Sequence, residues 1–387
     1  MTVSSPYAPT ALMVGNFVTG IALLAPTAML GELSAGLGVT IREAGLLITF
    51  GALVLCVGSP LLAWLTSRIE RRNLLASAVA VVAAANFISA FAPNYATLLV
   101  IRLLMAAIAA LYTPQAAGTV ALIVPLEKRG SSIAYVFLGW TLAVAVGLPL
   151  VTFIASRYGW RAVYGSIGVM SCFSYALLVW RLPRGLFGVP VDLKTWTDLA
   201  RNRLVVMLLL ITTLQISGQF VIFTFLAPLL TQLTGAGPDA GGLIFAAYGL
   251  CGLVGITTAT RIVDGWGALN TSLLATSLVL SGMTVWATGA GTLPVMAIGV
   301  AIWGLGFGAI NSMQQVRLVG AAPALAPASV SLNTSVLYVG QAIGSGIGGL
   351  LFAGGQFHAS GFVAMGFVAS ALLAIILSRG ISATPQP

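Results

Sequence analysis

Long apolar stretches alternate with short polar joints along the whole chain. A helix needs about 20 mainly apolar residues to cross the hydrocarbon core of a bilayer. Twelve stretches of roughly that length are free of charge clusters, at residues 11–35, 43–66, 74–92, 95–124, 132–155, 162–182, 204–233, 240–260, 270–290, 293–319, 328–352 and 359–378. The pattern therefore predicts an all-α membrane protein with twelve transmembrane helices.

The longest polar joint divides these spans into two groups of six. It runs from residue 183 to residue 203 and contains Asp192, Lys194, Asp198, Arg201 and Arg203. Two equal groups are typical of repeat-built membrane bundles, in which the binding site lies near the midplane between the halves. We therefore expect two pseudo-symmetric six-helix bundles, an N-terminal one over residues 1–190 and a C-terminal one over residues 191–387.

The composition excludes a soluble enzyme. Hydrophobic residues make up 59% of the 387 positions and charged residues 6%, whereas a soluble globular protein has roughly 25% charged residues. The three cysteines lack ligand-like spacing, and the sequence offers no Ser-His-Asp set, metal-ligand cluster or phosphate-binding glycine loop. We therefore expect no enzyme activity, no metal and no cofactor, and favour a transporter that draws on a gradient.

The basic residues predict an orientation in the membrane. The net charge is +9. If the N-terminus is cytoplasmic, thirteen of the 17 basic residues lie on the cytoplasmic side and three, Arg42, Arg157 and Arg161, lie outside. Cytoplasmic loops carry such an excess in membrane proteins. We expect a monomeric, multi-pass protein of the inner (plasma) membrane with both termini cytoplasmic. It should be surrounded by the lipid bilayer and should bind no nucleic acid.

Arg102 is the one basic residue left over, and it lies within the fourth predicted span. A charge at this depth costs at least ~2.5 kcal/mol on insertion scales and is a functional candidate. Its guanidinium stays protonated, so it could tune a partner or hold an anion. Alternatively, it is an internal strut that bonds carbonyls or polar groups of the first helix, near Asn16 and Thr19. All eight acidic residues fall at helix ends or in loops, which predicts a central cavity without a carboxylate.

Amide, hydroxyl and aromatic side chains recur at helical spacing in several spans. Amides facing lipid would be left unsatisfied, so these side chains should point into the bundle. There, each could join two helices or contact a substrate. As a set, they predict a substrate-binding surface made of Asn16, Arg102, Tyr112, Gln115, Gln215, Gln219, Phe223, Trp303, Asn311, Gln314, Tyr338 and Gln341.

Two joints and one span carry short motifs. The joint after the second span reads Ser67-Arg68-Ile69-Glu70-Arg71-Arg72, and the joint after the eighth span reads Asp264-Gly265-Trp266-Gly267. The fifth span contains Gly139, Gly147 and Pro149 and is followed by Gly159-Trp160-Arg161. Together with Arg102, these residues make nearly the whole chain resemble the major facilitator superfamily, and within it the drug and metabolite efflux branch.

The resemblance implies the twelve-helix fold of that superfamily and transport by alternating access. It makes Arg68, Arg71, Arg72 and Asp264 cytoplasmic gating residues, although Ser67 replaces the aspartate and Glu70 a glycine of the GxxxDRxGRR pattern. It links Arg102 to proton transfer. Gly139, Gly147 and Pro149 match a glycine-proline signature of exporters, but Leu150 and Val151 replace its later glycines. Proline removes a backbone donor and glycine permits close packing, so these three residues suit a helix that bends.

These observations predict a secondary active transporter that exports a small neutral or anionic organic solute by alternating access. Proton coupling is implied by the resemblance, because the residues themselves offer no central carboxylate. Facilitated diffusion without ion coupling is the first alternative. A membrane sensor that binds without transporting and a lipid translocase are two more.

Overall fold

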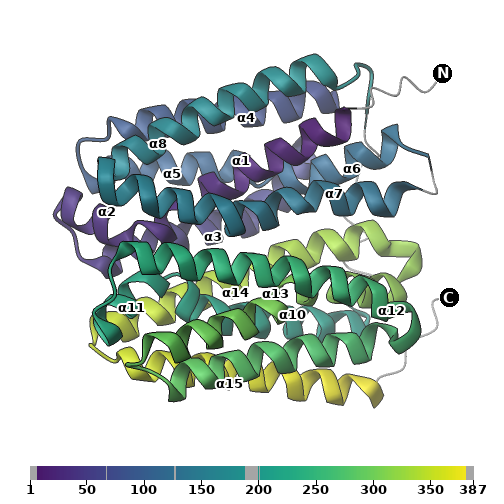
Figure 1. Ribbon diagram of the computed structural model, residues 1–387. Coiled ribbons are helices and arrows are strands. Elements are labelled where there is room, and N and C mark those ends of the chain that lie inside the picture. The colour runs from purple at the N-terminus through teal and green to yellow at the C-terminus, as the bar shows by residue number, and fades with distance from the viewer. Residues whose placement is uncertain (1–6, 67, 126–127, 188–198, 200, 381–387) are drawn as a thin grey trace.

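The computed structural model describes residues 7–66, 68–125, 128–187, 199 and 201–380, and within these ranges it is helical with no strand (Figure 1). The N-terminal elements are α1 (Ala8–Ala28), α2 (Leu30–Leu37), α3 (Ile41–Leu65), α4 (Arg71–Ala90), α5 (Tyr95–Ala109), α6 (Tyr112–Ile123), α7 (Arg129–Leu142), a π-helical turn (Ala143–Gly147) and α8 (Leu148–Arg181). The C-terminal elements are α10 (Arg203–Phe223), α11 (Leu226–Thr234), α12 (Pro238–Thr288), α13 (Leu293–Ala321), α14 (Ala326–Ala353) and α15 (Phe357–Leu377), with 3₁₀ turns at Pro323–Leu325 and Ser378–Gly380.

Ten helical stretches of the described chain are long and apolar enough to span a membrane. Two of them, Ser131–Arg181 and Pro238–Thr288, are 51 residues long. A straight helix of that length would measure about 77 Å, more than twice the hydrocarbon thickness of about 30 Å. Each is interrupted by a glycine with positive φ, Gly159 at 79° and Gly267 at 78°, a conformation that glycine adopts without a steric penalty. Each stretch therefore holds two crossings, and the twelve predicted spans are confirmed.

Three of the predicted spans are broken where the sequence predicted one continuous helix. The first span is interrupted at Met29, the fourth at Ala110 and Leu111, and the seventh at Thr224 and Phe225. Proline cannot donate to the carbonyl four residues earlier, and its ring clashes with that carbonyl. Pro114 and Pro228 stand four residues after Ala110 and Thr224, so the breaks in the fourth and seventh spans lie where a proline removes the helical hydrogen bond.

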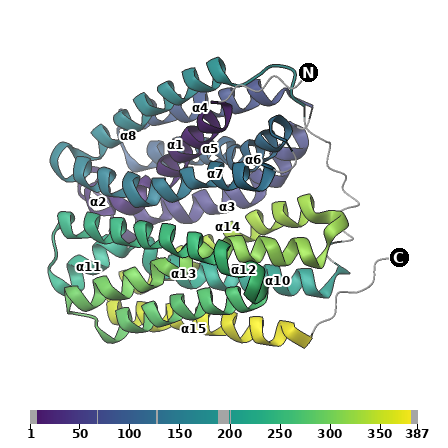
Figure 2. The same cartoon turned by 45° about the vertical axis from the view of Figure 1, so that its right-hand side comes forward.

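The helices form two groups that follow the order of the chain. Elements α1 to α8 lie together on one side and α10 to α15 on the other (Figures 1 and 2). We call these groups the N-half and the C-half. The start of α1 and the end of α15 lie at the same end of the molecule, which we call the terminal end, and α2 and α11 lie at the opposite, far end (Figure 1). The predicted boundary between residues 190 and 191 lies outside the described residues.

The halves make close contacts toward the far end. Thr49 Oγ1 on α3 and Ser345 Oγ on α14 are 2.9 Å apart and share a hydrogen bond. On α12, a Cβ atom added to Gly249 would lie 2.3 Å from the Cα atom of Ala145 in the N-half. Glycine permits this approach because it has no side chain. These contacts hold the two halves together on the side away from the termini.

Candidate functional site

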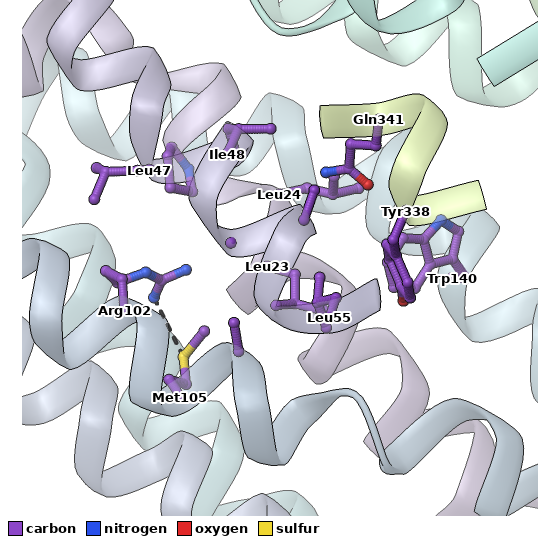
Figure 3. Close-up of a pocket in the computed structure, with 14 residues that line it drawn as sticks. Leu23, Leu24, Leu47, Ile48, Leu55, Arg102, Met105, Trp140, Tyr338 and Gln341 are labelled. Atoms are coloured by element: carbon purple, nitrogen blue, oxygen red, sulfur yellow. Dashed lines mark hydrogen bonds between the residues drawn. The ribbon is translucent and has the colours of Figure 1, made fainter. Parts of the chain in front are cut away.

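A small pocket lies between the halves, where α1, α3, α5 and α7 face α14 (Figure 3). Its lining is mostly aliphatic, and its polar side chains are those of Arg102, Trp140, Tyr338 and Gln341. The space inside is about 20 Å³, which is enough for about one water molecule. Pockets that hold organic ligands measure about 300–1,000 Å³. The halves must therefore move apart before a solute can occupy this position.

Arg102 lies on α5 at the N-half wall of the pocket and is 4% exposed. Its Nη1 donates to Asn86 Oδ1 at 3.2 Å and to Met105 Sδ at 3.4 Å, and the latter contact is drawn in Figure 3. Its Nη2 donates to the carbonyl oxygen of Ala22 on α1. The guanidinium also lies over the ring of Tyr164, 5.0 Å from the ring centroid. Four neutral groups on four helices thus hold this cation in place.

None of these partners carries a negative charge. Within the described residues, no carboxylate lies within the 4.0 Å that defines an ion pair with Arg102. A buried charge is costly unless it is paired, and Coulomb attraction is stronger in a low-dielectric interior than in water. The pocket therefore combines apolar walls with one uncompensated positive charge, which is an arrangement suited to an anionic group or to the oxygen atoms of a neutral solute.

The C-half contributes Tyr338 and Gln341 to the same pocket from α14. Both side chains are buried. Tyr338 belongs to a small apolar cluster with Leu55 and Ala106 of the N-half, and both Tyr338 and Trp140 line the pocket (Figure 3). Of the twelve predicted binding residues, Arg102, Tyr338 and Gln341 therefore meet at one pocket, with residues of both halves around it.

Asn16 and Tyr112 lie inside the N-half, away from the pocket lining. Asn16 Nδ2 donates to the carbonyl oxygen of Val136 at 2.9 Å, and the Tyr112 hydroxyl donates to that of Leu12 at 3.2 Å. Tyr112 fits against α1 because Gly15 has no Cβ, which would lie 1.8 Å from the tyrosine oxygen. In this structure both side chains join helices of one half.

In the C-half, four predicted binding residues form an amide and aromatic cluster, which we call the Gln219 box. Gln219 Oε1 accepts hydrogen bonds from Trp303 Nε1 at 2.9 Å and from the Tyr248 hydroxyl at 3.4 Å. Gln219 Nε2 donates to the carbonyl oxygen of Gln215 at 3.2 Å. The ring of Phe223 lies 5.1 Å from that of Tyr248 and 6.3 Å from that of Trp303. All five side chains are buried, and one amide thus joins three helices.

A second polar cluster in the C-half contains Asn311 and Gln314 of α13. Gln314 Nε2 donates to the carbonyl oxygen of Leu208 on α10 at 2.9 Å. Asn333 on α14 donates to Asn311 Oδ1 at 3.0 Å and accepts a hydrogen bond from the Thr212 hydroxyl at 2.7 Å. These contacts tie α10, α13 and α14 together within one half.

The family model described as Major Facilitator Superfamily matches residues 12–345. The chain belongs to this superfamily. It is therefore a multi-pass membrane transporter and not an enzyme, as predicted. It is 29% identical over 384 residues to "Inner membrane transport protein YdhP" of Escherichia coli O157:H7, covering 97% of this chain and 96% of that protein.

A second relative is "Probable sugar efflux transporter" of Mannheimia succiniciproducens, with 26% identity over 334 residues, 86% of this chain and 83% of the relative. Among solved structures, the D-xylose-proton symporter superposes with a TM-score of 0.75 at 16% identity and covers 98% of both chains. At that identity, the likeness concerns the fold.

The loop after α3, which carries the superfamily's GxxxDRxGRR-like pattern, forms hydrogen bonds within the N-half. Arg71 Nη1 donates to Gln115 Oε1 on α6, and Arg72 Nη2 donates to the carbonyl oxygen of Val179 near the end of α8. Glu70 Oε1 accepts a hydrogen bond from the backbone of Gly185 at 2.6 Å. This loop therefore binds the sixth crossing to the second, third and fourth ones at the terminal end.

The remaining predicted gating residues are exposed. Arg68 and Asp264 lie at the surface of the terminal end, while Ser67 lies outside the described residues. Both exposed side chains are free to meet new partners when the halves move.

The predicted bending residues surround an irregular turn in the fifth crossing. A π-helical turn at Ala143–Gly147 comes directly before Leu148 and Pro149, and the Leu148 N–H donates to the carbonyl oxygen of Ala143. Gly139 lies so close to α1 that a Cβ would be 2.2 Å from the Met13 carbonyl oxygen, and a Cβ on Gly147 would be 2.4 Å from the Ile21 side chain. Glycine thus allows α1 to pack on both sides of this turn.

Four site residues were missed by the sequence reasoning. Asn86 and Tyr164 position Arg102, Trp140 lines the pocket, and Tyr248 completes the Gln219 box. Each is a polar or amphipathic aromatic residue within an otherwise apolar span. That placement was the available signal, since an unsatisfied polar group in lipid is costly.

Proposed function

We propose that this transporter exports a small neutral or anionic organic solute from the cytoplasm by alternating access of its two halves, residues 1–190 and 191–387. The observation that carries the proposal is Arg102, a buried cation without a described carboxylate partner, which faces Tyr338 and Gln341 of the other half. One relative is named a probable sugar efflux transporter, and this supports export.

The collapsed pocket supports the alternating mechanism. About 20 Å³ of space does not admit an organic solute. A solute can contact Arg102 and Gln341 together only after the halves separate on one side and later close around it. A solute that complements the charge of Arg102 then favours the conformation in which it contacts this residue, because a ligand shifts an equilibrium only through its different affinities for the two states.

We further propose that both termini are cytoplasmic in the inner membrane and that the protein works as a monomer. The excess of basic residues at the terminal end supports this orientation. We attribute the same excess to contact with the membrane surface and not to nucleic-acid binding. The conformation described here is then closed toward the outside. Protease accessibility of a C-terminal tag in right-side-out vesicles tests the orientation, and light scattering of the detergent complex tests the monomer.

One measurement identifies the energy source of transport. No described carboxylate lines the pocket, so proton coupling through a central acid has no support from the described residues. Purified protein in liposomes should be tested for uphill solute movement under an imposed pH gradient. Accumulation against the solute gradient would establish proton-coupled transport and eliminate facilitated diffusion. Equilibration without accumulation would indicate facilitated diffusion and eliminate proton coupling.

The role of Arg102 is tested in the same liposomes with matched solutes. Arg102→Ala should abolish transport of the anionic members of a panel of sugars and organic acids, and Arg102→Lys should retain part of it. Arg157→Ala, which removes an exposed arginine at the far end, is the control. Undiminished transport by Arg102→Ala would overturn the central role of this residue. Binding without any flux would instead indicate a sensor, and movement of fluorescent lipid would indicate a translocase.

A further inference from the structure

A second, larger hollow lies on the outside of the seam between α3 and α14, near the far end. It has about 340 Å³ of free space, which falls in the range of ligand pockets. Arg42, Leu46 and Thr49 line it from the N-half, and Ser345, Gly346 and Gly349 are among the residues that line it from the C-half. We call this hollow the seam groove. From Arg42 to Thr49 it follows α3 for about 10 Å, roughly a third of the hydrocarbon thickness.

The seam groove is open because of a glycine. A Cβ added to Gly346 would meet Thr49 Cγ2 at 3.7 Å and no nearer described atom outside its own helix, so a larger side chain would enter the groove. The rim includes Ile343 and Leu350, both of which are exposed apolar side chains of α14. In a transporter that is surrounded by lipid, an apolar rim of this kind faces hydrocarbon chains.

Arg42 stands at one end of the seam groove, in the first turn of α3. Its side chain is exposed, and its Cγ atom lies 3.6 Å from the position of a Cβ on Gly349. The aliphatic stem therefore crosses from the N-half onto the C-half, and the exposed side chain stands at the first turn of α3, where the span begins. Long basic side chains at helix ends extend toward the membrane surface in this way.

No described carboxylate lies within the 4.0 Å that defines an ion pair with the guanidinium of Arg42, whose Coulomb interaction is with the neighbouring Glu43. The neighbouring carboxylate of Glu43 accepts hydrogen bonds at Oε2 from the backbone and the hydroxyl of Thr40, at 2.7 and 2.8 Å. It therefore caps the start of α3. The other described acids at this end, Glu32 and Asp239, lie on α2 and α12 and do not line the groove.

We propose that the seam groove binds one anionic phospholipid, with an acyl chain along Leu46 and Gly346 and the headgroup phosphate on Arg42. Apolar walls, a rim that faces lipid and one exposed cation that forms no ion pair with a described carboxylate match the two parts of such a molecule. The occupant would touch both halves. It binds best when α3 and α14 are together, and it therefore stabilises the state that is closed at the far end.

Binding is tested by native mass spectrometry of the purified protein with phosphatidylglycerol or phosphatidylcholine of the same chain length. We expect one tightly retained phosphatidylglycerol and weaker retention of phosphatidylcholine. Arg42→Gln should weaken phosphatidylglycerol binding about fivefold, whereas Arg157→Gln, at the same end but outside the groove, should not. Gly346→Leu should remove the bound lipid by filling the groove, and Gly366→Leu, at an exposed position of α15, should not.

Equal retention of the two lipids by the wild-type protein would overturn the proposal, and so would equal losses in Arg42→Gln and Arg157→Gln. Each variant must elute from size exclusion as the wild type does. If Arg42→Gln fails this check, the comparison of the two lipids and the pair of glycine variants still decide the matter. Transport of fluorescent phosphatidylglycerol across the bilayer would show that lipid is cargo and would also overturn the proposal.

The conformational effect rests on the proposed alternation and is measured separately. Spin labels at Ala35 on α2 and Gln232 on α11, in a background without the three native cysteines, report the distance across the far end. Phosphatidylglycerol nanodiscs should increase the short-distance population about twofold over phosphatidylcholine nanodiscs, and Arg42→Gln should cancel the increase. An unchanged distance with confirmed lipid binding would refute the conformational part alone. Failure of solute transport would refute the proposed function without affecting the lipid site.

Discussion

Pro26 exposes the carbonyl oxygen that Arg102 binds. In an unbroken helix, the N–H of residue 26 would donate to the carbonyl oxygen of Ala22, but proline has no N–H. Arg102 Nη2 donates to that oxygen from α5. Neighbouring helices often satisfy carbonyl groups that a proline frees inside a membrane. The proline on one helix therefore fixes the position of the charge on another.

This relationship predicts a double-mutant coupling. Arg102→Ala leaves the Ala22 carbonyl and the Asn86 amide oxygen without their donor, and a buried unsatisfied group costs about 1–3 kcal/mol. Pro26→Ala restores an N–H that reaches the Ala22 carbonyl. The double variant should therefore be about 1 kcal/mol more stable than the two single effects added together. Unfolding in mixed micelles measures this, and strict additivity would contradict the relationship.

The Gln219 box predicts a stability effect that can be dissected. Gln219→Leu leaves the Trp303 N–H and the Tyr248 hydroxyl buried without an acceptor, and each such group costs about 1–3 kcal/mol. Trp303→Phe removes one of these donors and should be milder. The double variant should lose less than the sum of the two single variants. Thermal unfolding in detergent measures the series. A loss in the double variant equal to the sum of the two single losses would show that the bond to Trp303 contributes nothing.

The pocket predicts anion binding that does not depend on pH near neutrality. Its described lining contains two titratable side chains, Arg102 and Tyr338, and in water guanidinium and phenol groups titrate well above neutral pH. A lining carboxylate would gain a proton on acidification, and anion binding would then strengthen as the pH fell. Here we expect the affinity for an alkylsulfonate, which keeps its charge, to change less than twofold between pH 6 and pH 8. Isothermal titration calorimetry measures it, and a tenfold rise toward pH 6 would reveal an acid near the pocket.

Gly249 predicts how tightly the halves close. A Cβ at this position would lie 2.3 Å from the Ala145 Cα atom, so Gly249→Ala should force α12 away from the fifth crossing and reduce the far-closed population. Gly242, also on α12, is the matched control, because a Cβ there would find its nearest neighbour at 3.7 Å. The distance between labels at Ala35 and Gln232 should lengthen for Gly249→Ala and stay unchanged for Gly242→Ala. Equal distances in both variants would argue against a close contact at Gly249.

The sequence predicted the twelve crossings because twenty apolar residues in a row have few alternatives to spanning a bilayer. It did not predict the breaks inside the first, fourth and seventh crossings. Pro114 and Pro228 were visible in the sequence, but a proline either kinks a helix or ends it according to the packing around it. The π-helical turn at Ala143–Gly147 depends on the same kind of contact and was likewise not predicted.

The candidate site was predicted in part. Arg102 was identified because a charge within an apolar span is conspicuous, and Tyr338 and Gln341 because they share one face of a helix. The partners of Arg102 were expected near Asn16 and Thr19, whereas the structure shows Ala22 and Asn86. Helical periodicity tells which residues share a face, but not the depth at which two helices meet. Contacts between helices therefore had to come from the structure.

A centre with room for about one water molecule also has a consequence for the cell's electrical insulation. Ions and protons leak along continuous files of water, and no such file fits through a hollow of this size. The resting carrier therefore acts as part of the permeability barrier, so that a gradient can be maintained across it between one turnover and the next.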